Sequence, residues 1–335
     1  MTLNWAGFHQ KLDGYGYATI VLGQGLRRLD ASVNIVDMDE RGRCPWGTDK
    51  VWQLPGTTIA LCTPDWYPQF EAERLIGYTM FEATRLPAGW TDKINAHCAE
   101  LYVPCEWCRH VFQANGVTVP ISVVKWGIAP RDYFPLARDP EHTPYTFLWS
   151  GTADLRKGWD VAYQAFMEAF GDDKRVELIM HFRADLPGHL SFSDRNVRNL
   201  IGLFDRPMLR GMLEWADCFI FPSRGEGWGN PPREAAATGL PVIATDFGGL
   251  AEDLSHWALP IDVVGYSPAR YGFWEDIGAW AEPSITQLAQ TMQWCFEHRQ
   301  EAADFGEGAA NWLRENATYQ QTAQAILDLQ RSAVC

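Results

Sequence analysis

Long apolar runs are missing from this chain of 335 residues. Because no stretch of about 18 or more apolar residues occurs, no segment is expected to span a membrane. The first residues, Met1 to Gly7, lack the basic and apolar regions of a secretory signal peptide, and we therefore expect a cytoplasmic protein. At 47% hydrophobic residues, the chain still has enough apolar side chains for two domains, each with a core.

Basic residues are scarce as well. There are 28 Lys and Arg residues against 42 Asp and Glu residues, a formal net charge of −14, and the acidic excess lies in the second half. A broad basic face is the usual footprint of proteins that bind nucleic acid or anionic lipid. We therefore do not expect broad nucleic-acid binding.

Spacings typical of metal sites are also rare. Eight cysteines without a secretory signal indicate a reducing compartment and mostly free thiols. The pair Cys105 and Cys108, with His97, Cys98 and His110 nearby, is a possible zinc or redox site. No second Cys-x-x-Cys follows at finger-like spacing, so we favour a buried strand running into a helix, and expect no metal.

Apolar strand-like runs alternate with helical patterns in both halves, which predicts α/β architecture with mostly parallel sheets and helices on both faces. Prolines at 130, 135, 140 and 144 indicate a linker. We expect domains at 1–140 and 141–315, followed by a helix within 316–335. The predicted strands are 3–6, 33–36, 58–61, 76–82, 101–103, 121–124, 145–149, 176–180, 217–222 and 241–245. The predicted helices are 15–29, 90–96, one between 103 and 121, 159–170, 231–238 and the region from 284 onward.

The most specific segment is the glycine-rich stretch from Phe221 to Glu234. It follows an apolar strand and leads into a helix, so its loop opens at the carboxyl end of a strand, where open α/β sheets bind ligands. Backbone N–H groups at such a helix start favour an anion. The two carboxylates, Glu226 and Glu234, flank the turn. A plainer alternative for Glu234 is stabilisation of the helix through its macrodipole.

The whole run resembles the E-x7-E signature of retaining, nucleotide-sugar-dependent glycosyltransferases of family 4 (glycosyl transferases group 1). Ser223, Pro232, the segment 239–244 and Gly248-Gly249 also fall where that pattern has them. The resemblance implies the GT-B fold, in which two Rossmann-like parallel-sheet domains face each other across a cleft. It also implies a last helix that crosses back to the first domain.

By this resemblance, Glu234 accepts hydrogen bonds from the ribose hydroxyls of a UDP- or GDP-linked sugar, while Glu226 faces the transferred sugar. A second motif, Gly151 to Gly158, resembles the phosphate loop of the family, and Lys157 matches its lysine. The family arginine falls on Thr152, which leaves Arg156 as a candidate substitute. The remaining donor-binding candidates are Gly16, Gly151, Gly227, Trp228, Gly229 and Asn230.

Such transfer needs no metal and no cofactor if cations and helix N-termini absorb the charge of the departing diphosphate. Lys157 and Glu226 are accordingly the catalytic candidates. The acceptor is expected to be a carbohydrate or another molecule that bears a hydroxyl group. The acceptor-side candidates by resemblance are His9, Gly14, Tyr15 and Glu82, of which His9 and Glu82 also fit ordinary surface or packing roles.

Other functions remain open at this point. Gly14 and Gly16 before a helix, with Asp37 after the second strand, suggest a NAD-dependent oxidoreductase, although Thr19 stands at the third glycine position. The spacing of Asp37 and Asp39 suggests the metal-binding motif of a GT-A enzyme. A GT-B sugar-nucleotide epimerase, a non-catalytic sugar-nucleotide binder and a glycosidase that uses the two Glu residues are further alternatives.

Overall fold

The computed structural model describes residues 2–9, 14–38, 52–139, 141–183, 192 and 194–332. Residues 10–13, which directly precede Gly14, and Asp39 lie outside the described residues. The chain folds into two compact units. Unit 1 is Met1–Gly127, Ala269–Gly278 and Ala317–Cys335, and unit 2 is Ile128–Pro268 and Ala279–Asn316. Residues 128–140, which the sequence analysis placed in the first domain, therefore belong to unit 2.

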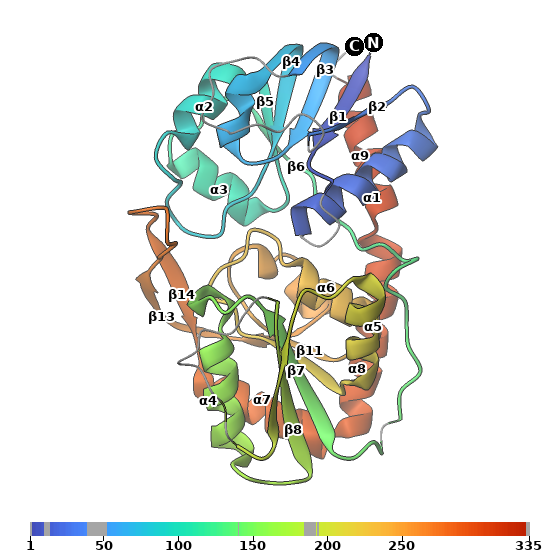
Figure 1. Ribbon diagram of the computed structural model, residues 1–335, viewed down its shortest axis with the longest axis vertical. Coiled ribbons are helices and arrows are strands. Elements are labelled where there is room, and N and C mark those ends of the chain that lie inside the picture. The colour runs from blue at the N-terminus through green and yellow to red at the C-terminus, as the bar shows by residue number, and fades with distance from the viewer. Residues whose placement is uncertain are drawn as a thin grey trace. The chain divides into compact units, whose positions relative to one another are not determined.

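Unit 1 contains a six-stranded parallel sheet in the order β2-β1-β3-β4-β5-β6 (Figure 1). The strands are β1 (Leu3–Gly7), β2 (Asn34–Asp37), β3 (Trp52–Leu61), β4 (Phe70–Tyr78), β5 (Glu100–Val103) and β6 (Ile121–Val123). Its helices are α1 (Gly14–Leu29), α2 (Trp90–His97), α3 (Glu106–Ala114) and α9 (Tyr319–Ser332). Helix α9 lies beside α1, where the rings of Tyr17 and Tyr319 meet edge to face at 6.5 Å.

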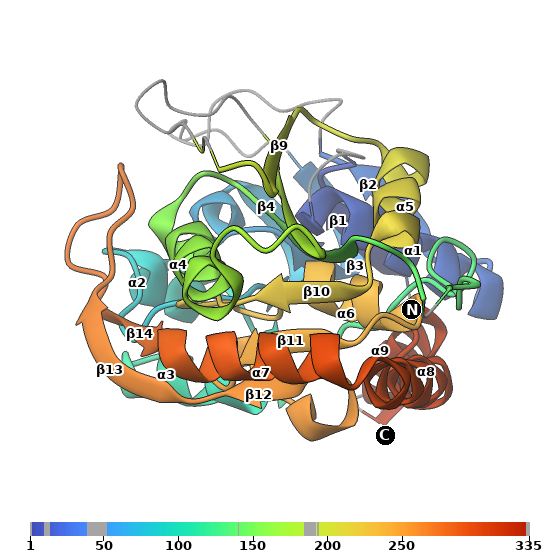
Figure 2. The ribbon, with the colours of Figure 1, turned by 90° about the horizontal axis from the view of Figure 1, so that it is seen from below.

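Unit 2 contains a second six-stranded parallel sheet in the order β12-β11-β10-β7-β8-β9. The strands are β7 (Tyr145–Gly151), β8 (Val176–Phe182), β9 (Val197–Ile201), β10 (Cys218–Phe221), β11 (Val242–Thr245) and β12 (Leu259–Ile261), with an antiparallel pair β13 (Val263–Pro268) and β14 (Ala279–Pro283). Its helices are α4 (Trp159–Phe170), α5 (Arg206–Trp215), α6 (Asn230–Ala237), α7 (Ile285–Glu297) and α8 (Arg299–Asn316). Helices α4 and α7 lie side by side (Figure 2).

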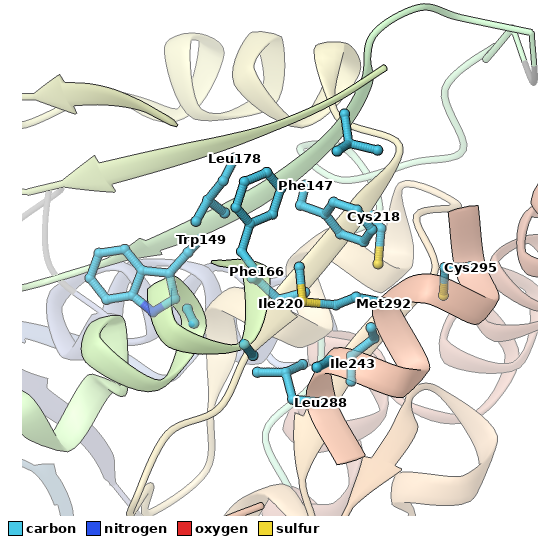
Figure 3. Packing of buried hydrophobic residues seen from close by; sticks show 14 of the residues in the cluster. Phe147, Trp149, Phe166, Leu178, Cys218, Ile220, Ile243, Leu288, Met292 and Cys295 are labelled. Carbon is cyan, nitrogen blue, oxygen red and sulfur yellow. The ribbon is translucent and has the colours of Figure 1, made fainter. Parts of the chain in front are cut away.

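The core of unit 2 forms where alternate side chains of the sheet meet α4 and α7 (Figure 3). Phe147 and Trp149 from β7, Leu178 from β8 and Ile220 from β10 are fully buried there, in one cluster with Leu288 of α7. Because successive strand residues point to opposite faces, this packing fixes the register of β7 and β10. The loops that follow these two strands therefore start from well-defined positions.

The α/β architecture predicted from the sequence is confirmed, but several elements were missed. Strand β9 was not predicted because it lies at the edge of the sheet and carries Arg198 and Asn199, so no apolar run marks it. Helix α5, β12 and the β13–β14 hairpin were also missed. The predicted strand at 76–82 is in fact β4, which begins at Phe70 and ends at Tyr78.

The Cys-x-x-Cys pair lies where a strand runs into a helix, as favoured above. Cys105 is the N-cap of α3, and its sulfur accepts a hydrogen bond of 3.5 Å from the backbone N–H of Cys108. The cysteines that the structure describes are all buried free thiols. As for membrane crossing, no helix in the described part of the chain combines the necessary length with the necessary apolar character.

Candidate functional site

Two loops of unit 2 meet beyond the carboxyl ends of β7 and β10. The first follows Gly151 and leads into α4, and the second follows Phe221 and leads into α6. Because β7 and β10 are adjacent parallel strands, their carboxyl ends lie at the same edge of the sheet. The backbone N–H of Arg224 donates to the carbonyl of Arg156 at 2.7 Å, which joins the loops directly.

The first loop is shaped by one turn of 3-10 helix, Leu155–Lys157. Asp154 caps this turn by accepting a hydrogen bond of 2.8 Å from the N–H of Arg156. Gly158 then adopts φ 68°, and a Cβ atom there would lie 1.9 Å from the carbonyl oxygen of Pro222. Only glycine permits this close approach. The turn therefore brings Lys157 against the second loop.

Three donors converge on one oxygen of Glu226. Its Oε1 accepts hydrogen bonds from Lys157 Nζ at 2.6 Å, Ser223 Oγ at 2.9 Å and Arg156 Nη1 at 3.1 Å. Arg156 also donates to the carbonyl of Gly225 at 2.8 Å. The side chain of Glu226 is 9% exposed. The two adjacent cations thus point at the same carboxylate.

The charge of Glu226 follows from this arrangement. Burial alone would raise the pKa of its carboxyl, but the Lys157 and Arg156 cations and the hydrogen bonds from Lys157 and Ser223 outweigh burial. The net effect lowers the pKa of Glu226. The carboxylate is therefore ionised at neutral pH, and the cations beside it are partly neutralised.

The two loops are held together by Arg224. Its guanidinium donates to both carboxylate oxygens of Asp160, at 2.7 and 2.8 Å, and to Glu282 at 2.8 Å. Asp160 lies in the first turn of α4, and Glu282 lies in β14. Since Arg224 is committed to these partners, it acts as a clamp on the loops. Sequence reasoning did not identify it.

The second loop is packed from inside by Arg233 of α6. The guanidinium of Arg233 lies over the ring of Trp228 at 3.9 Å and donates to the carbonyls of Gly249 at 2.9 Å and Glu252 at 3.0 Å. Trp228 is 3% exposed. Its ring is therefore part of the packing, and the carbonyls of Trp228 and Gly229 accept hydrogen bonds from the same guanidinium.

The start of α6 differs from a typical anion site. Its first three residues are Asn230, Pro231 and Pro232, and proline has no backbone N–H. Of these three, Asn230 alone can donate from its backbone. The positive charges beside Glu226 come from the side chains of Lys157 and Arg156.

Glu234 lies one turn further along α6 and has its own cation. Arg206 Nη1 lies 3.1 and 3.3 Å from the two carboxylate oxygens of Glu234, and it also donates to the hydroxyl of Tyr133 at 2.8 Å. The side chains of Arg206 and Glu234 are 20% and 13% exposed. Sequence reasoning missed both Arg206 and Tyr133, which are distant from Glu234 along the chain.

Two further donor-side candidates, Thr152 and Gly16, do not contact Glu226 in the hydrogen bonds described above. Thr152 is exposed directly after Gly151, and Gly16 is buried in α1 of unit 1. The structure thus brings together Gly151, Arg156, Lys157 and Glu226 in unit 2, with the loop residues that follow Glu226 beside them.

The acceptor-side candidates all lie in unit 1. His9 Nδ1 is 3.0 Å from Asp37 Oδ1, so the acid proposed for a dinucleotide ribose is paired with a histidine. Tyr15, at the start of α1 next to Gly14, accepts a hydrogen bond of 3.2 Å from the backbone N–H of Met80. Burial raises the pKa of the Tyr15 phenol, with a smaller contribution in the same direction from Glu82.

Glu82 is approached by the loop 269–278. The hydroxyl of Tyr271 donates to Glu82 Oε1, and Trp274 packs edge to face on Phe81 and Trp90 at 5.6 and 5.2 Å. The neighbouring Phe273 is 74% exposed. No signal in the sequence pointed to this loop, because it interrupts a short hairpin of unit 2.

Comparison with known proteins gives a family match. The family described as glycosyl transferases group 1 matches residues 144–262, so the resemblance to this group is confirmed for that part of unit 2. A D-inositol 3-phosphate glycosyltransferase from Paenarthrobacter aurescens is 28% identical over 57% of this chain and 44% of its own length. A glycogen synthase from Mycobacterium tuberculosis is 27% identical over 48% of this chain and 41% of its own length. The chain thus spans less than half the length of these curated relatives.

Similar solved structures cover the whole chain. A sucrose-phosphate synthase from Thermosynechococcus elongatus superposes with a TM-score of 0.73 and 13% identity, covering 100% of this chain and 99% of the other. HepE from Anabaena, solved in complex with UDP and glucose, gives a TM-score of 0.71 and 12% identity, with 99% and 100% coverage. The fold is therefore GT-B, as the resemblance implied.

Proposed function

We propose that this chain, in which residues 144–262 match glycosyl transferases group 1, transfers a sugar from a UDP- or GDP-linked donor to an acceptor hydroxyl with retention of anomeric configuration. The observation that carries the proposal is the convergence of Lys157 and Arg156 on Glu226 in a glycine-rich loop at the carboxyl ends of β7 and β10. A buried carboxylate beside two cations suits a ligand that presents both hydroxyl groups and phosphate.

In the proposed reaction, the bond between the anomeric carbon and the diphosphate oxygen breaks while the acceptor oxygen bonds to the same face of that carbon. The departing phosphate oxygen takes the proton of the acceptor hydroxyl. Lys157 stabilises the negative charge that develops on the diphosphate, and Arg156 holds Glu226 in position. Glu226, ionised at neutral pH, accepts hydrogen bonds from hydroxyls of the donor sugar.

On the donor's nucleotide side, Glu234 accepts hydrogen bonds from the ribose hydroxyls. Two acceptor oxygens on one carboxylate match a vicinal diol. The nearby backbone of Gly227, Trp228 and Gly229 and the N–H of Asn230 complete the proposed donor site in unit 2, together with Gly151 and Thr152. Gly16 of unit 1 stays a separate candidate for a donor contact. The complex of HepE with UDP and glucose supports a nucleoside-diphosphate sugar as the donor class.

For the acceptor, we propose a carbohydrate or another hydroxyl-bearing molecule that contacts unit 1 through His9, Gly14, Tyr15 and Glu82. The names of the relatives, which include a D-inositol 3-phosphate glycosyltransferase and a glycogen synthase, fit a polyhydroxylated acceptor. The comparisons lend no support to an oxidoreductase, and the pairing of Asp37 with His9 also speaks against that alternative.

The proposal includes metal independence and residence in the cytoplasm. Lys157 and Arg156 provide the positive charge that a divalent cation supplies in GT-A enzymes. Full activity in excess chelator is expected. Loss of activity that Mg²⁺ or Mn²⁺ restores would show that the charge of the diphosphate is neutralised in another way.

The direct test begins with thermal shifts in the presence of UDP, GDP and ADP, followed by their sugar conjugates. The best donor is then incubated with simple sugars and inositol, and the anomeric configuration of the product is read by proton NMR. A retained configuration supports the proposal. Epimerised donor without transfer identifies an epimerase, and tight donor binding without turnover identifies a sugar-nucleotide binder; either result contradicts the proposal.

A further inference from the structure

We propose that Arg206 and Tyr133 are positioning residues that orient Glu234 to accept both hydroxyls of a donor ribose, so that the protein selects ribonucleotides. The inference rests on the proposed function and extends it to two residues outside the sequence motifs. Arg206 comes from the first position of α5, Tyr133 from the segment that precedes β7, and Glu234 from α6. All three lie in unit 2.

The contacts of Arg206 restrict the orientation of the Glu234 carboxylate. A single guanidinium nitrogen, Arg206 Nη1, lies almost equally far from the two oxygens of Glu234, at 3.1 and 3.3 Å. The same nitrogen donates to the Tyr133 hydroxyl at 2.8 Å, and Tyr133 is 2% exposed. The Tyr133 hydroxyl in turn hydrogen-bonds the Glu234 carboxylate. Because a carboxylate offers about four lone-pair sites, these contacts leave acceptor sites on Glu234 for a diol.

The position of Arg206 supports a role beyond helix stability. A cation at the first position of a helix faces the positive end of the helix dipole, which is unfavourable, and the N-cap function is already filled by Asp205. Residues that break a local rule are expected at functional sites. The guanidinium is also largely removed from water, since its side chain is 20% exposed. A cation removed from water needs an opposite charge beside it, so Arg206 favours the ionised form of Glu234.

The charged state of Glu234 depends on its neighbours. Burial raises the pKa of the Glu234 carboxyl, Asp132 adds to the rise, and Arg206, the Tyr133 hydroxyl and Arg183 at the end of β8 oppose it. The net effect of these neighbours is a Glu234 pKa above the ordinary value of 4.5. Protonation removes an acceptor lone pair, so ribose recognition should weaken as the pH falls through this pKa. Without Arg206, the pKa rises further.

The experiment measures dissociation constants by calorimetry for UDP and GDP and for their 2′,3′-dideoxy analogues, between about pH 5 and about pH 8. The phosphates of each pair titrate alike, so the ratio of the two constants isolates the ribose hydroxyls. For the unmodified protein at neutral pH, we expect the ribonucleotide to bind about tenfold more tightly or better. The preference should decline at the acidic end.

The variants are Arg206→Met, Tyr133→Phe and Glu234→Gln. The matched control is Arg210→Met, on the same helix, where the guanidinium lies over the ring of Phe134 at 5.2 Å. We expect Arg206→Met to reduce the ribose preference nearly to that of Glu234→Gln, and to shift the loss of the remaining preference to higher pH. Tyr133→Phe, which removes a single hydroxyl, should do the same to a smaller extent. Arg210→Met should match the unmodified protein.

The outcomes distinguish a failure of the positioning role of Arg206 and Tyr133 from a failure of the proposed function. If a ribonucleotide binds but Arg206→Met and Tyr133→Phe keep both the preference and its pH dependence while Glu234→Gln loses the preference, the positioning role is wrong and the proposed function stands. If the unmodified protein shows no ribose preference, the inference is also overturned. If neither UDP nor GDP binds, the proposed function fails and the inference fails with it. Thermal midpoints establish that each variant is folded.

Discussion

Arg224 holds both carboxylate oxygens of Asp160, at 2.7 and 2.8 Å, across the junction of the two loops that form the candidate site. The two side chains are 11% and 18% exposed, so the pair is largely removed from water. Its position ties the start of α4 to the loop that carries Glu226. The geometry of the site therefore depends on the contact between Arg224 and Asp160 as well as on the hydrogen bonds to Glu226.

Replacing Arg224 by Met should lower the free energy of unfolding by about 3 kcal/mol, because it leaves Asp160 and Glu282 without their shared cation. Urea unfolding measures the effect. The control is Arg175→Met, which removes an exposed pair with Asp173 and should leave the unfolding midpoint unchanged. Equal midpoints for Arg224→Met and the unmodified protein would show that the clamp is dispensable.

Lys157→Ala should slow turnover about a hundredfold, because the ammonium is assigned to the charge of the departing diphosphate. Glu234→Ala should instead raise the donor KM about tenfold, with a smaller effect on kcat, because it removes a binding interaction with the nucleotide. Steady-state kinetics with the best donor separates the two effects. Lys174→Ala, at an exposed position, serves as the control for charge removal. Unchanged kinetics in both site variants would remove the site assignment.

Gly158→Ala should weaken both folding and donor binding. A Cβ at this position meets the carbonyl oxygen of Pro222 at 1.9 Å, and the backbone has φ 68°, so the turn before α4 must shift and carry Lys157 with it. Gly211→Ala in α5 is the matched change, because its Cβ has nothing within 4 Å. That variant should gain about 0.4 to 1 kcal/mol. Thermal melts with and without nucleotide compare the two proteins.

The stability difference between the protein and Glu226→Gln should depend on pH in a defined direction. The pKa of Glu226 is lowered in the folded state, so its ionised form contributes stability that is fully present above the ordinary value of 4.5. That contribution is lost as the pH falls through the lower, folded-state pKa. Urea unfolding of both proteins between about pH 7 and about pH 3.5 should show their difference shrinking at the acidic end. A constant difference would contradict the assigned shift.

The sequence predicted what local patterns determine. Apolar runs marked β7 and β10, proline and glycine bounded α6, and the motif spacing singled out Lys157 and Glu226, which the structure places 2.6 Å apart. Local patterns could not predict contacts between segments that are far apart in the sequence. Arg206 reaches Glu234 from the start of α5, which follows the edge strand β9, and Tyr133 comes from the segment before β7. Strand β9 carries no periodic signal. The loop 269–278 was hidden because its flanking strands are short and half-exposed.

The division of the chain into units has a consequence for synthesis. The polypeptide passes from one unit to the other after residues 127, 268, 278 and 316. Unit 1 starts at the N-terminus, yet it is closed by the loop beside Glu82 and by α9, which covers α1. A nascent chain that has emerged as far as residue 127 still has an uncovered apolar face on α1. Of the two units, the one whose first segment is made earlier is thus the one whose last segment is made later.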